Sequence, residues 1–145
     1  RGLGDVYKRQ ESYCEKCVED FTVKTMNLDI SIKSLSGGNV QKVIVAREFT
    51  AGAEIIVLNQ PTRGVDVGAM EFIHKKILEM RDEKKSLILV SADLTELRAL
   101  SDRIIVFHQG KVAGVIDDVP GTTEEELGLY MLGLKEDPAE KLQEA

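Results

Sequence analysis

Short apolar runs and amphipathic segments alternate along most of this chain of 145 residues. The apolar runs that we expect to form strands are 55–58, 87–90 and 103–107. Residues within the first two follow one another without polar interruption, which is typical of strands covered by helices on both faces. The expected helices lie at about 37–51, 69–81 and 95–100, where apolar residues recur at helical spacing. This order predicts an α/β fold with a mostly parallel sheet and flanking helices.

The end of the chain adds a hairpin and a last helix to this pattern. Gln109-Gly110 predicts a turn that joins the third strand to 111–116, as one antiparallel edge of the sheet. A helix is expected over 123–134, and 136–145 is predicted to be a charged, frayed tail.

The start of the chain is less regular. Residues 1–10 show no helical or strand periodicity that continues into the next segment, and they resemble a translated sequencing adapter. We therefore expect a non-native leader there. Gly2 and Gly4 would also begin a nucleotide-binding glycine loop, but the third glycine and a preceding strand are missing. A short helix is expected over 11–20, with Tyr13, Cys17 and Val18 on one side.

A polar, glycine-rich turn, Leu35-Ser36-Gly37-Gly38-Asn39, leads into the helix of 37–51. Ser34 or Ser36 is expected to cap this helix and Gly52 to end it. The expected buried stripe consists of Val40, Val43, Ile44 and Ala46 or Arg47. Consecutive glycines at a helix start allow the backbone to approach a phosphate, which the first-turn amides would bind. The alternative is an ordinary serine-capped helix.

Composition narrows the classes of function. A hydrophobic content of 43% over 145 residues suffices for one domain with a core, and the net charge of −6 argues against a nucleic-acid partner. No apolar run approaches the roughly 18 to 20 residues of a membrane-spanning helix, so membrane association would pass through a partner protein. Cys14 and Cys17 form a C-x-x-C, which is either a redox or zinc half-site or a pair of reduced thiols in a cytoplasmic protein. His74 and His108 lie far from this pair in sequence, and neither is assigned a catalytic role.

The spacing of two motifs indicates a family. The turn continues through Gln41 and Lys42, and one helix later an apolar strand ends in Asn59-Gln60-Pro61-Thr62-Arg63-Gly64-Val65-Asp66. Over about Glu11–Asp118 this order resembles the second half of the ATP-binding domain of ABC transporters. The nearest resemblance is to the second ATPase domain of the double-domain proteins that energise import of simple sugars or nucleosides.

The resemblance implies a partial P-loop NTPase fold. The phosphate-binding pattern G-x-x-x-x-G-K-[ST] is missing, since the only Gly-Lys dipeptide is Gly110-Lys111 in the expected hairpin turn. In the family the strand of that loop lies between those matching 87–90 and 103–107, so the fragment is expected to have a gap there. The implied organisation is the end of a helical subdomain over 11–34, the C-terminal half of the ATPase core over 35–118, and a C-terminal helix and tail over 119–145.

The resemblance also implies roles for individual residues. Leu35, Ser36, Gly37, Gly38 and Asn39 match the signature turn, which caps the γ-phosphate of ATP bound to the opposite ATPase domain. Asp66 matches the loop that touches that domain. Three other positions depart from the family pattern: Asn59 where an Asp helps hold Mg²⁺, Gln60 where a Glu polarises water, and Ala92 where a His senses the γ-phosphate. Singly, Asn59 and Gln60 could merely end a strand, and Ala92 could be core packing.

Together these matches predict a function. The expected protein is the ATP-binding subunit of an importer, with ATP and Mg²⁺ as cofactors, a second ATPase domain and permease subunits as partners, and a place at the cytoplasmic face of the membrane. Its own site is expected to be degenerate because an amide takes no proton at neutral pH. The rival interpretation is a nucleotide-independent α/β interaction module.

Overall fold

The computed structural model describes residues 3–143 of the chain. Their contacts form two compact units, one extending to Val90 and the other starting at Ser91. Within the described residues, no helix has the length and apolar content needed to cross a membrane.

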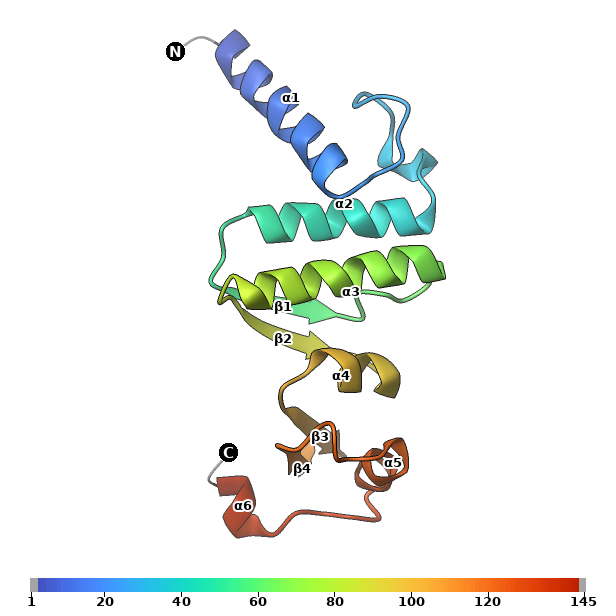
Figure 1. The fold of residues 1–145 in the computed structure, drawn as a ribbon, viewed down its shortest axis with the longest axis vertical. Helices are drawn as coiled ribbons and strands as arrows, with labels where there is room; N and C mark the ends of the chain where they lie inside the picture. The colour runs from blue at the N-terminus through green and yellow to red at the C-terminus, as the bar shows by residue number, and fades with distance from the viewer. Residues whose placement is uncertain (1–2, 144–145) are drawn as a thin grey trace. The chain divides into compact units, whose positions relative to one another are not determined.

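The first unit contains three α-helices, one short 3-10 helix and a two-stranded sheet. Its elements are α1 (Leu3–Asp20), η1 (Ile32–Ser34), α2 (Gly37–Thr50), β1 (Ile55–Asn59), α3 (Val67–Asp82) and β2 (Ser86–Val90). Strands β1 and β2 run parallel, in a register that pairs Ile55 with Ser86 and Asn59 with Val90. Helices α2 and α3 lie side by side, and α3 lies against the sheet (Figure 1). The predicted parallel pair and its connecting helix are therefore confirmed.

The face that α2 buries differs from the predicted one. Its buried residues are Gly38, Val45, Ala46 and Phe49. Only Ala46 of the predicted stripe is among them, whereas Ile44 is 37% exposed. The contacts of α2 with α3 determine which face is buried. The apolar residues of α2 are compatible with more than one buried stripe, so the sequence alone did not select this one. The predicted ends are correct, since Ser36 caps the start of α2 and Gly52 follows its end with a φ of +77°.

The expectation that the strands are covered on both faces is wrong for the described chain. Ile56 and Leu58 of β1 are 5% and 6% exposed, whereas Ile55 and Val57 between them are 63% and 64% exposed. In β2, Ile88 is also exposed, at 52%. One face of this parallel sheet is thus buried at β1 and half-buried at β2, and the other presents aliphatic side chains.

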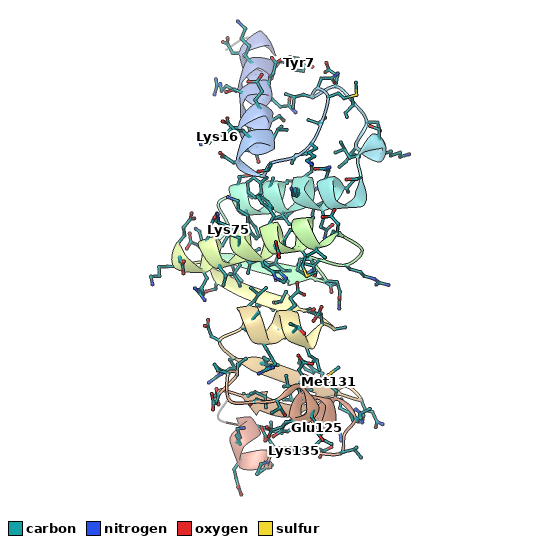
Figure 2. All side chains as sticks on the ribbon, turned by 45° about the vertical axis from the view of Figure 1, so that its right-hand side comes forward. Tyr7, Lys16, Lys75, Glu125, Met131 and Lys135 are labelled. Carbon is teal, nitrogen blue, oxygen red and sulfur yellow. The ribbon has the colours of Figure 1, made fainter. Side chains whose placement is uncertain are left out.

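Helix α1 begins earlier than predicted. It starts at Leu3, so the segment 3–10 is helical, contrary to the expectation of no regular structure before Glu11. Tyr7 in this part is 63% exposed, and it is labelled near the start of α1 in Figure 2. That residues 1–10 are a non-native leader stays a prediction, and Arg1 and Gly2 lie outside the described residues. Cys14 and Cys17 are half-buried free thiols.

The second unit combines a hairpin with three short helices. Its elements are α4 (Leu94–Leu100), β3 (Ile104–His108), β4 (Lys111–Ile116), α5 (Glu124–Met131) and α6 (Ala139–Gln143). The antiparallel pairing of β3 with β4 confirms the predicted hairpin, with a bulge at Val106/Phe107. Its core consists of Ile104, Val106, Ala113, Ile116, Val119, Leu127 and Tyr130.

Strand pairing agrees with the expected gap. In the described part of the chain, β1 pairs with β2 and β3 pairs with β4, as two sheets rather than one. A sheet that lacks the strand between β2 and β3 would show this pairing. The predicted boundaries after residues 34 and 118 stay predictions.

The end of the chain is more ordered than predicted. Thr123 caps α5, which ends at Met131 rather than near Leu134, and the segment expected to be frayed forms α6 from Ala139. Figure 2 labels Lys135 beside α5, where its ammonium lies 4.8 Å from the ring centroid of Tyr130. The prediction of a frayed tail is therefore wrong for residues 136–143, because polar side chains attach this segment to the hairpin. Residues 144 and 145 lie outside the described part.

Candidate functional site

The predicted signature turn forms the N-terminus of α2. Ser36 has extended backbone angles and its Oγ accepts hydrogen bonds from Asn39, at 3.4 Å from the backbone N–H and 2.9 Å from the side-chain amide. The Lys24 N–H donates to Asn39 Oδ1 at 2.8 Å, which attaches the turn to the loop after α1. Amides in the first turn of a helix have no acceptor within the helix. The Ser36 hydroxyl accepts a hydrogen bond from the Asn39 N–H, and the N–H groups of Gly37 and Gly38 lie in the same first turn of α2.

The second glycine of the turn lies against the start of α3. A Cβ atom at Gly38 would come within 3.0 Å of Asp66 Oδ2 and 3.1 Å of Ala69 Cβ. At Gly37 the nearest such neighbour would be the carbonyl oxygen of Gly64, at an ordinary 3.5 Å. Gly38 is therefore required for close packing of two helix starts, a role that the sequence analysis missed because it depends on residues 28 positions away.

Asp66 caps the helix that this packing involves. Its Oδ1 accepts a hydrogen bond from the Ala69 N–H at 2.9 Å. Gly64, two residues earlier, has a φ of +74°, a value that favours glycine. The structure thus brings the predicted partner-contacting loop directly beside the predicted signature turn.

Gln41 joins α2 to the end of β1. Its Nε2 donates to the Pro61 carbonyl at 2.8 Å, in a partly buried position. Gln60 has a φ of +51°, and its N–H donates to the Val90 carbonyl at the end of β2, at 2.8 Å. The Gln41 contact ties the signature turn to the strand end, and it gives Gln41 a structural role that spacing alone did not reveal.

The two polar side chains at the end of β1, Asn59 and Gln60, carry no charge. Asn59 is exposed and Gln60 is half-buried, and both side chains are amides. Ala92 belongs to the second unit, where it precedes Asp93, the residue that caps α4. The described residues contain no cluster of three or more His, Cys, Asp or Glu side chains suited to a metal ion.

These donor sets fit a phosphate better than a metal ion. A serine hydroxyl, two glycine amides and the positive end of a 14-residue helix form a suitable anion-binding surface, and Ser36 and Gly37 are exposed. Mg²⁺ prefers carboxylate oxygens and substrate phosphates, so Asn59 and Gln60 fit Mg²⁺ poorly.

Comparison with curated proteins finds relatives that are much longer than this chain. The chain is 42% identical over 127 residues to the nucleoside import ATP-binding protein NupA of Lactococcus lactis, and 41% identical over 138 residues to the guanosine import ATP-binding protein NupO of Bacillus subtilis. The matches cover 88% and 95% of this chain, but 25% and 26% of the relatives. A ribose import ATP-binding protein of Lacticaseibacillus paracasei is 39% identical over 89% of the chain. The chain therefore spans about a quarter of the length of these relatives.

Solved structures with a similar fold are ATP-binding cassettes. A dimeric cassette in a post-hydrolysis state, with ADP and phosphate bound, superposes with a TM-score of 0.65 at 24% identity, over 74% of this chain and 47% of the cassette. The ATP-binding subunit of another ABC transporter gives a TM-score of 0.69 at 19% identity, over 84% of this chain and 55% of that subunit. At these identities the likeness establishes the fold alone, which is the fold of part of an ATP-binding cassette. No family model matches the chain.

Proposed function

We infer the function from the premise that this chain corresponds to a segment of the ATP-binding proteins of ABC importers. We propose that it is the C-terminal part of the second ATPase domain of an importer for simple sugars or nucleosides. In this proposal the segment supplies its signature turn to ATP bound on a partner ATPase domain, while its own site does not hydrolyse ATP efficiently. The supporting observation is the turn at Ser36–Asn39, held against the Gly64–Asp66 loop.

The turn is suited to recognise a terminal phosphate on another domain. The Ser36 hydroxyl and the amides of Gly37 and Gly38 would hold the phosphate, and the dipole of α2 would favour its negative charge. Asn39 and Gln41 position this group through their bonds to Lys24 and Pro61. Leu35, the first residue of the turn, is half-buried. ATP itself supplies the phosphate anhydride, whose hydrolysis would drive transport.

The strand end supports the second half of the proposal. General-base assistance is worth about 10²- to 10⁴-fold in rate, and neither Asn59 nor Gln60 accepts a proton at neutral pH. Ala92 has no hydrogen-bonding side chain with which to sense a phosphate. The proposed partners are the other ATPase domain and the permease subunits, and the proposed place is the cytoplasmic face of the membrane, where the permease recruits the protein.

The test uses the longer transporter protein that contains this segment, assembled with its permease. Ser36→Arg places a bulky side chain in the turn, and Gly37→Asp places a negative charge there. Each is expected to lower ATP hydrolysis and transport by at least about 10²-fold, comparable with the loss of one transition-state donor. Ser34→Arg is the matched control, because Ser34 is an exposed residue two positions before Ser36.

Gln60→Glu tests the degenerate site. It restores one carboxylate while position 59 keeps its amide and position 92 has no histidine, so transport is expected to stay within about threefold of the parent, far below the 10²-fold scale of general-base effects. If Gln60→Ala abolished transport as completely as Gly37→Asp, the proposed division of labour would be refuted. If Ser34→Arg lowered ATP hydrolysis and transport as much as Ser36→Arg, the proposed role of the turn would be contradicted.

A further inference from the structure

Residues 135–143, here called the C-terminal strap, lie along the outer edge of β4. The Asp137 N–H donates to the Ala113 carbonyl at 2.8 Å, and Asp137 Oδ2 accepts from the Val115 N–H at 2.9 Å. Lys141 donates from Nζ to the Val115 carbonyl at 2.6 Å. One backbone donor and two backbone acceptors of β4 are thus satisfied by the strap.

These three groups lie on the edge of β4 that faces away from β3. Successive residues of a strand direct their N–H and C=O groups to alternate edges, so Ala113 and Val115 share one edge. Val115 is opposite Ile105 in the hairpin, yet its N–H is bound to Asp137, which identifies this edge as the outer one. Such an edge is a template for pairing with another strand unless something covers it.

The strap is held by a connected set of polar contacts. Lys141 Nζ also donates to Asp137 Oδ2 at 2.8 Å, and the Tyr130 hydroxyl donates to Asp137 Oδ1 at 2.8 Å. The Asp137 side chain is 8% exposed. Lys135 pairs with Glu126 of α5, which attaches the start of the strap. Asp137 is therefore the centre of the contact between the strap, α5 and β4.

We propose that the C-terminal strap is an autoinhibitory cover that prevents β4 from pairing with the β4 strand of a second copy of this chain. Strand β4 is six residues long, and the strap binds the backbone groups of Ala113 and Val115 on this edge. Two copies of one strand pair antiparallel about a two-fold axis, so the uncovered edge is self-complementary. Displacement of the strap converts a monomer into a dimer through the second unit.

The experiment compares the full 145-residue chain with the double variant Asp137→Ala/Lys141→Ala. The control is Glu136→Ala/Glu140→Ala, which removes two exposed charges from the same segment. Hydrogen exchange of the Val115 amide is measured at low protein concentration, and sedimentation equilibrium is measured over a concentration series. In the Asp137→Ala/Lys141→Ala variant, exchange at Val115 should accelerate at least about tenfold, because a hydrogen bond to a charged acceptor is lost. Dimer should appear in this variant as concentration rises, and both readouts should stay unchanged in the control.

A synthetic peptide with the sequence of residues 134–145 serves as the second test. Added in excess to the double variant, it should restore protection of Val115 and return the dimer to monomer, whereas the same peptide with alanine at the position of Asp137 should do neither. Lys141→Met, which keeps the Asp137 bonds to Tyr130 and Val115, provides a milder variant that should give a smaller acceleration. The proposal is overturned if Val115 stays protected in both variants, if the double variant stays monomeric, or if its association ignores the peptide.

Discussion

Substitution of Gly38 tests whether the signature turn depends on close packing between two helix starts. Gly38 is buried in the first turn of α2, and an added Cβ would lie 3.0 Å from Asp66 Oδ2 and 3.1 Å from Ala69 Cβ. Ala69 is itself 5% exposed and lies in α3, so its Cβ moves only if that helix moves. Asp66 yields more easily, but its carboxylate caps α3 through the Ala69 amide.

Two opposing effects determine the size of the change. Replacing glycine by alanine inside a helix stabilises by about 0.5 to 1 kcal/mol, because the unfolded chain loses conformational freedom. Overpacking typically costs about 1 to 3 kcal/mol, and a disturbed helix cap costs about 0.5 to 2 kcal/mol. We expect the contacts at Gly38 to outweigh the helical gain, so that Gly38→Ala lowers the free energy of unfolding by about 1 kcal/mol, within the ordinary range for single substitutions. Gly38→Val adds two methyl groups to the same contact and should cost more.

Gly68→Ala is the matched control. Gly68 also lies in the first turn of a helix of the first unit, but its added Cβ would meet only Asp66 Oδ1, at an ordinary 3.4 Å. This variant should be as stable as the parent or more stable. Urea denaturation followed by far-UV circular dichroism gives the free energy of unfolding of each variant. If Gly38→Ala proved as stable as Gly68→Ala, the packing role of Gly38 would be refuted.

Three further predictions concern the isolated chain. It should show no ATP hydrolysis in a phosphate-release assay with Mg²⁺, because it lacks a phosphate loop with its lysine; turnover near about 10 s⁻¹, typical of enzymes, would contradict this. Burial alone would raise the pKa of Asp137, but hydrogen bonds from Lys141, Val115 and Tyr130 outweigh it and lower the pKa from 3.8 to about 2. The ionised carboxylate therefore stabilises the fold fully above about pH 4, and this stabilisation disappears as the pH falls through 2. Asp137→Asn should lower the free energy of unfolding at pH 7 by on the order of 1 to 2 kcal/mol and should weaken its dependence on pH below 4. Finally, backbone amides in 87–91 and 103–107 that point away from the paired strand should exchange their hydrogens rapidly. They should become protected when the upstream half of the domain is supplied. Slow, cooperative exchange of both whole segments in a soluble monomer would show that no strand is missing.

Much of the candidate site followed from residue order. Ser-Gly-Gly before a helix and Asn-Gln-Pro-Thr after a strand led to the prediction of the turn, the strand end and the loop at Gly64–Asp66 as parts of one site. The structure places the turn beside that loop, and the roles of these residues stay predictions. The contacts that hold these parts together were not visible in the sequence. The Gln41 bond to Pro61 and the packing of Gly38 on Asp66 join residues 20 and 28 positions apart, so no local pattern encodes them.

The sequence by itself determined where helices and strands begin and end in the middle of the chain. Caps such as Ser36, the ending at Gly52 and the hairpin turn at Gln109-Gly110 act through neighbouring backbone groups, and these predictions were correct. Sterics and hydrogen bonds within a few residues are sufficient to set such boundaries.

The tertiary structure alone decided which side chains are buried and which segments are held. Helix α2 turns Val45 and Phe49 inward rather than Ile44, because its contacts with α3 select one face of a helix that is apolar on several. The charged C-terminal segment is ordered because Asp137 and Lys141 satisfy the outer edge of β4, more than 20 residues earlier in the chain. Burial and long-range hydrogen bonding depend on what the fold brings alongside each residue, and a local sequence pattern contains no information about that neighbour.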